Sequence, residues 1–64
     1  MKRRDLERHL REHGCEILRE GGNHTTYINR SLKTYSSIPR HNEIKKYMVR
    51  KICADLGAPV PRGS

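Results

Sequence analysis

The 64-residue sequence has no tryptophan, no phenylalanine and only three tyrosines, and hydrophobic residues make up 33% of the chain. A chain this short forms one domain with a small core. These deficits exclude the large, enclosed active site of a dehydrogenase or a kinase. An enzyme of this size has to hold its substrate on its surface, and a polymer backbone is the kind of substrate that suits such a surface.

Cysteine and long apolar segments are also scarce. Cys15 and Cys53 are too few for a disulfide framework, so we expect both thiols to be reduced and to lie in the core. The run Met1–Arg4 leads into Asp5 rather than into an apolar segment, which argues against a signal peptide. No segment reaches membrane-spanning length. We therefore expect a cytoplasmic protein without a membrane partner.

Positive charge is abundant. The chain has 14 Lys and Arg against 7 Asp and Glu, which gives a net charge of +7. Such an excess is typical of proteins that bind nucleic acid, and it is also compatible with an acidic protein partner. An anionic membrane is disfavoured because no segment joins a basic face to a leucine-rich or aromatic face. The candidate phosphate contacts are Arg30, Lys33, Lys45, Lys46, Arg50 and Lys51.

Hydrophobic spacing predicts two helices. Residues 2–13 have leucines at positions i and i+4, and Gly14 follows as a helix stop. Residues 46–56 have an amphipathic stripe, and Gly57 follows. The stripe consists of Val49, Ile52, Cys53 and Leu56.

Short β-favouring segments predict strands over residues 15–19, 24–29 and 35–38. The fold class is therefore α+β, with the order α-β-β-β-α. We expect a three-stranded antiparallel sheet with both helices on one face and the other face open to solvent. The domain spans residues 1–57. The tail, residues 58–64, ends in a sequence similar to part of a thrombin-cleavage tag; it could also be native, and no function is assigned to it.

A glycine-rich turn precedes the most informative residue. Gly21, Gly22 and Asn23 tolerate positive φ and predict a turn that presents His24 at the start of a strand. Histidine is the side chain best suited to proton transfer near neutral pH. Strand alternation places Tyr27 on the face opposite His24. We expect Tyr27 to point inward and His24 to lie on or near the open face, an arrangement that a β-bulge would reverse.

The order and spacing of these pieces resemble the HicA toxins of bacterial toxin–antitoxin pairs. The resemblance runs from the first helix to Gly57. It rests on Gly22-Asn23-His24 with an aromatic residue three positions later, and on the segments Ile38-Pro39-Arg40-His41, Glu43-Ile44-Lys45-Lys46 and Asp55-Leu56-Gly57. The chain departs from the family where Asn23 replaces a common serine and where Tyr47-Met48 replaces a common Gly-Thr pair that caps the last helix.

This resemblance implies a fold like that of double-stranded-RNA-binding domains, ribosome-independent cleavage of mRNA, and neutralisation by a HicB-type antitoxin. It implies that His24 is the catalytic histidine. As a general base, His24 would take the proton of an RNA 2′-hydroxyl, which then attacks the adjacent phosphorus, so no metal or other cofactor is required. Candidates for a second catalytic or phosphate-binding group are His41, Lys45 and Arg40.

Two other functions remain open from the sequence: an RNA-binding module that does not cut, and a basic interaction domain for an acidic partner protein. Tyr27 and Tyr35 could stack on unpaired bases, although a core position for one of them is the simpler interpretation. His9 and His13 have a spacing that can bind zinc, but no second pair of ligands is visible, so no metal site is predicted.

Overall fold

The computed structural model describes residues 1–62. Along the chain it contains α1 (Arg3–Glu12), β1 (Cys15–Glu20), β2 (His24–Asn29), β3 (Thr34–Pro39) and α2 (Lys46–Leu56). The α-β-β-β-α order confirms the prediction, and every predicted end lies within one residue of the observed end. In the described part of the chain, no helix is both long enough and apolar enough to cross a membrane.

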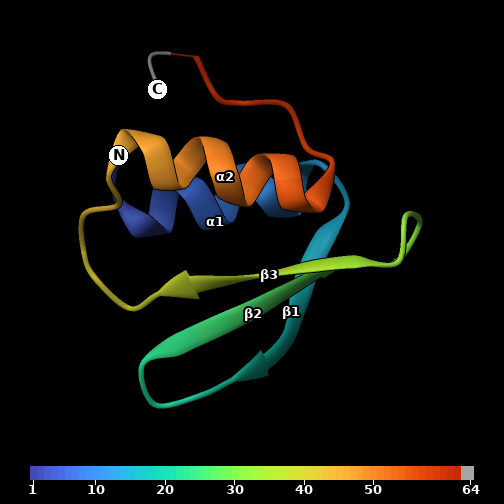
Figure 1. Cartoon of the computed structure of the whole chain (residues 1–64), viewed down its shortest axis with the longest axis horizontal. Coiled ribbons are helices and arrows are strands. Elements are labelled where there is room, and N and C mark those ends of the chain that lie inside the picture. The colour runs from blue at the N-terminus through green and yellow to red at the C-terminus, as the bar shows by residue number, and fades with distance from the viewer. Residues whose placement is uncertain (63–64) are drawn as a thin grey trace.

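The strands form one antiparallel sheet in the order β1-β2-β3. Both helices cover the same face of this sheet and leave the other face open (Figure 1). The core lies between the helices and the sheet, with Tyr27 as its largest side chain. The core residues are Leu6, Leu10, Cys15, Tyr27, Ile38, Ile44, Val49, Ile52, Cys53 and Leu56.

Both cysteines are buried and free, which confirms their predicted place in the core. Burial raises the pKa of the Cys15 and Cys53 thiols, because the low-dielectric core disfavours the thiolate. Neither thiol therefore has the lowered pKa of a reactive cysteine.

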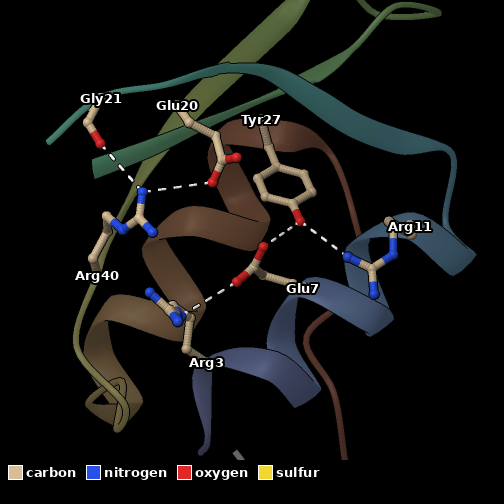
Figure 2. A network of polar contacts seen from close by, with 7 residues as sticks. All are labelled: Arg3, Glu7, Arg11, Glu20, Gly21, Tyr27 and Arg40. Carbon is tan, nitrogen blue, oxygen red and sulfur yellow. Dashed lines mark hydrogen bonds and ion pairs between the residues drawn. The ribbon is translucent and has the colours of Figure 1, made fainter. Parts of the chain in front are cut away.

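A polar network ties α1 to the sheet (Figure 2). The buried Tyr27 hydroxyl donates a hydrogen bond of 2.5 Å to Glu7 Oε1 and accepts one of 3.2 Å from Arg11 Nη1. Arg3 Nε lies 3.4 Å from the other carboxylate oxygen of Glu7. The buried phenol thus has the hydrogen-bond partners that its desolvation requires.

The two ends of α2 are held differently. Lys45 is the N-cap residue and makes no side-chain cap hydrogen bond, as expected from the missing threonine. At the other end, Gly57 has φ 69° and its N–H donates to the carbonyl of Ala54. The buried side chain of Asn29 donates to the Leu56 carbonyl at 2.8 Å, so the end of β2 satisfies the last turn of α2.

The histidine pair of α1 makes contacts within the chain. The two rings lie 4.4 Å apart; His9 Nε2 donates to the Pro59 carbonyl at 2.6 Å, and His13 Nδ1 donates to the His9 carbonyl at 2.9 Å. Within residues 1–62 no cluster of three or more His, Cys, Asp or Glu side chains could hold a metal ion. Pro59 belongs to the predicted tail, of which residues 63–64 lie outside the described part.

Candidate functional site

His24 is the first residue of β2 and its side chain is exposed. The turn before it is closed by the Gly21 N–H, which donates to the His24 carbonyl at 2.8 Å. Neither Gly21 nor Gly22 has a positive φ, so the turn forms as predicted but not through the left-handed conformation. Gly22 instead leaves space, because a Cβ at this position would meet no atom within 4 Å.

The alternation of β2 agrees with the prediction. Thr25, Tyr27 and Asn29 are buried against the helices, whereas His24 is exposed and Ile28 is partly exposed on the other face. The pairing of β2 with β3 is continuous from His24↔Pro39 to Asn29↔Thr34. The only register shift in the described sheet lies in β1, so it does not turn Tyr27 outward.

The open face of the sheet has a hollow of about 360 Å³ beside His24. The β1–β2 turn forms one wall of this hollow. Strand residues, among them Arg19 of β1, form the rest of its lining. The lining is mostly polar and consists of Arg19, Gly21, Gly22, Asn23, His24, Thr26 and Ser37. We call this the His24 hollow.

Arg19 reaches the His24 hollow because of a β-bulge. Ile17 pairs with Tyr27, but Arg19 pairs with Thr26, so Leu18 is one extra residue in β1. In continuous pairing Arg19 would stand opposite Thr25, on the helix-covered face. The extra residue moves Arg19 to the face of Thr26 and His24. Because nothing in the β1 sequence marks the bulge, sequence analysis did not identify Arg19.

The same register shift turns Glu20 toward the helix-covered side, where it meets Arg40. Arg40 Nη1 lies 3.6 Å from Glu20 Oε1 and donates to the Gly21 carbonyl at 3.3 Å (Figure 2). The backbone N–H of Arg40 also donates to the Asn23 carbonyl at 3.1 Å. Of the three candidates for a second group, Arg40 is therefore the one held against the turn that carries His24.

The other two candidates, His41 and Lys45, line a separate hollow of about 280 Å³ between the end of β3 and the first turn of α2. Pro39 belongs to this second hollow and is also the cross-strand partner of His24. We call it the Tyr47 hollow, after its exposed aromatic residue. The two hollows are thus neighbours along β3 and do not merge.

The predicted phosphate contacts are divided between the two ends of the sheet. Lys45 is the N-cap residue of α2 and Lys46 is its first residue. This start of α2 lies at the end of the sheet to which β3 runs, where the β1–β2 turn also lies (Figure 1). Arg30 follows β2 at the opposite end and pairs with Glu16 at 2.6 Å. Lys33, which has φ 57°, lies in the turn at that far end.

The two cations farther along α2 also differ from each other. Arg50 is exposed, and Lys51 forms an ion pair of 3.1 Å with Asp55 on the same helix. Lys45 and Lys46 thus lie at the same end of the sheet as His24. Arg30 and Lys51 instead have carboxylate partners within the chain.

The candidate phosphate contacts predicted from the sequence did not include one further group of cations. Lys2, Arg3 and Arg4 line a hollow of about 250 Å³ with Asn42, where the Arg3 N–H donates to the Asn42 carbonyl. This segment joins the β3–α2 loop at the same end of the molecule (Figure 1). The run of three consecutive cations in the sequence was the available signal.

These features define a small basic α+β domain with an exposed histidine at the edge of a polar hollow. The family model described as the HicA toxin of bacterial toxin–antitoxin systems matches residues 3–58. The match covers nearly the whole chain, and the chain belongs to the HicA toxin family. No curated protein and no solved structure gives a significant match. Membership of this family implies that the protein has an antitoxin partner.

Proposed function

We propose that this toxin is an endoribonuclease that cleaves mRNA independently of the ribosome and without a metal ion, with His24 as the general base. The observation that carries the proposal is that His24 and Arg19 line one polar hollow on the uncovered face of the sheet. A single-stranded RNA backbone can lie along an open face, whereas an enclosed pocket would exclude a polymer.

The chemistry needs few groups. His24 takes the proton of the 2′-hydroxyl, the 2′-oxygen bonds to phosphorus, and the bond from phosphorus to the 5′-oxygen breaks. The 5′-oxygen takes up a proton from water and leaves, and the protonated His24 returns its proton to the solvent. The products are a 2′,3′-cyclic phosphate and a 5′-hydroxyl. Arg19, which lines the same hollow, stabilises the negative charge that develops on the phosphoryl oxygens, and Arg40 holds the turn through its contacts with Gly21 and Glu20.

We further propose that the antitoxin is a HicB-like protein that covers the His24 hollow, and that the toxin acts in the cytoplasm, where its substrate is. The exposure of His24 and the glycine turn beside it leave this face accessible to a protein. Labelling with a histidine-modifying reagent tests the contact. We expect the purified antitoxin to protect His24, and undiminished labelling in the complex would count against this proposal.

The cleavage assay uses end-labelled single-stranded RNA with a chelator present. We expect the natural chain to produce a ladder of 2′,3′-cyclic phosphate products, and His24→Ala to slow cleavage by roughly 10²–10⁴-fold. His13→Ala is the matched control, because His13 is also an exposed histidine but lies at the C-terminal end of α1. Cleavage by His24→Ala at the natural rate would refute the mechanism. Binding without cleavage by the natural chain would favour a non-catalytic RNA-binding module.

A further inference from the structure

The Tyr47 hollow differs from the His24 hollow in chemistry. Its floor and walls include Pro39, Ile44 and Met48, so more of its lining is apolar. Tyr47 stands at its edge on the first turn of α2, and 66% of the residue is exposed. A volume of about 280 Å³ lies just below the roughly 300 Å³ at which sites for drug-sized ligands begin, which suits one planar heterocycle.

Tyr47 contributes little to the fold. It is not part of the hydrophobic core, and within residues 1–62 no side chain forms a hydrogen bond with its hydroxyl. An aromatic residue is also a weaker helix former than alanine. A large, exposed, rigid ring beside an apolar hollow is the arrangement in which proteins stack unpaired bases.

The charges at the Tyr47 hollow favour an anion. Glu43, its one acidic lining residue, is bound by the terminal amino group of Met1 at 2.8 Å, which lowers the pKa of the carboxyl. Lys45 is the N-cap residue of α2 and Lys46 is its first residue, and the first turn of that helix has no acidic residue. These two cations and the positive end of the helix dipole all attract a negatively charged phosphate.

The position of the Tyr47 hollow connects it to His24. Pro39 lines the hollow and pairs directly with His24 across the β2–β3 ladder. Arg40, the next residue, lies against the glycine turn. A strand of RNA whose scissile phosphate lies at His24 would therefore pass its neighbouring nucleotide over Pro39 toward Tyr47.

We propose that the Tyr47 hollow binds one unpaired nucleobase next to the scissile phosphate, with Tyr47 as the stacking surface and Lys45 beside the phosphate of that nucleotide. The inference rests on the proposed RNA function of the His24 hollow. It makes the first turn of α2 a determinant of where the RNA is cut. The stacking residue, Tyr47, is also one of the two positions at which this chain departs from the Gly-Thr pair common in the family.

The test measures RNA binding separately from cleavage. The probe is a short single-stranded oligonucleotide with 2′-O-methyl groups, which cannot be cleaved, and with one 2-aminopurine base, whose fluorescence falls on stacking. We expect the natural chain to bind the probe and quench it. Tyr47→Ala should weaken binding about tenfold or more and restore the fluorescence, and Tyr47→Phe should retain both. Thermal unfolding of each variant checks the fold.

Tyr35→Ala is the comparison variant, and we expect it to reduce binding and quenching less than Tyr47→Ala does. Tyr35 is also 66% exposed, but it pairs with Ile28 toward the far end of the sheet. Equal binding and quenching by natural chain and Tyr47→Ala would overturn the base site, while cleavage dependent on His24 would leave the proposed function intact. Absence of any RNA binding by the natural chain would overturn both. Loss of antitoxin binding alone in Tyr47→Ala would assign the hollow to the protein partner instead.

Discussion

The Tyr27 hydroxyl and the Glu7 carboxylate join the central strand to the first helix through a hydrogen bond of 2.5 Å. Tyr27 is completely buried, and Arg11 donates to the same hydroxyl oxygen (Figure 2). Burial raises the pKa of Tyr27 to about 12, and the hydrogen bond and negative charge of Glu7 add to the rise, while Arg11 opposes it. The phenol is therefore kept neutral well into the alkaline range.

Tyr27→Phe should lower the free energy of unfolding by about 1–3 kcal/mol, because it removes a buried hydrogen bond to a charged group. It should also change the alkaline stability. An unfolded tyrosine loses its proton near pH 10, whereas the folded one loses it near 12. The contribution of Tyr27 is therefore present below pH 10 and is lost as pH rises toward 12. Urea unfolding across this range measures both effects.

The control for this experiment is Tyr35→Phe, because Tyr35 is exposed and its hydroxyl makes no hydrogen bond within residues 1–62. We expect its stability to match that of the natural chain at every pH. Equal alkaline losses in the natural chain and in Tyr27→Phe would show that the buried phenol is not responsible.

Three glycines should respond to alanine in a fixed order. Gly57 has φ 69°, and an added Cβ would overlap Leu32 Cδ1; Gly14 has φ 84° with no atom within 4 Å. Gly22 has neither a positive φ nor a neighbour. A left-handed backbone costs an L-residue roughly 1–2 kcal/mol. Gly14→Ala should therefore lower the free energy of unfolding by about this amount, and Gly57→Ala by more because of the added overlap. Gly22→Ala should not lower it. Thermal unfolding ranks them, and a loss in Gly22→Ala equal to that in Gly57→Ala would contradict the geometry.

The predictability of this fold follows from its local signals. The leucines of α1 and the stripe of α2 have helical spacing, and glycines end both helices, so sequence alone located these elements. Period-two alternation in β2 placed Tyr27 and His24 on opposite faces. Arg19 was missed because a bulge is a tertiary compromise with no local residue to mark it. The Tyr47 hollow arises from the packing of the β3–α2 loop, which no spacing in the sequence reveals.

RNA affinity should depend on salt through some of the predicted cations and not through others. Lys45 and Lys46 lie at the end of the molecule that carries the glycine turn, whereas Lys51 is paired with Asp55 at 3.1 Å. Each true phosphate contact on a single strand contributes about 0.7 to the slope of log affinity against log salt. Lys45→Ala and Lys46→Ala should each lower the slope by about that amount, and Lys51→Ala should leave it unchanged. Titrations at several salt concentrations measure the slopes. Identical slopes for the three variants would show that Lys45 and Lys46 do not differ from Lys51 in contacting phosphate.

Arg19 should contribute to cleavage although no sequence pattern singles it out. It lies in the His24 hollow because Leu18 is inserted into β1, and in the proposed reaction its positive charge stabilises the negative charge that develops on the phosphoryl oxygens. Removal of one such donor typically slows the chemical step by roughly 10²-fold, so Arg19→Ala should lower kcat by about that amount while thermal stability stays close to natural.

Arg30→Ala is the matched control, because Arg30 is also an exposed arginine but pairs with Glu16 at the far end of the sheet. Single-turnover cleavage of saturating RNA separates the chemical step from binding. If Arg19→Ala changed only the affinity for RNA, or slowed cleavage no more than Arg30→Ala, the bulge would serve to position a phosphate contact and not to stabilise the transition state.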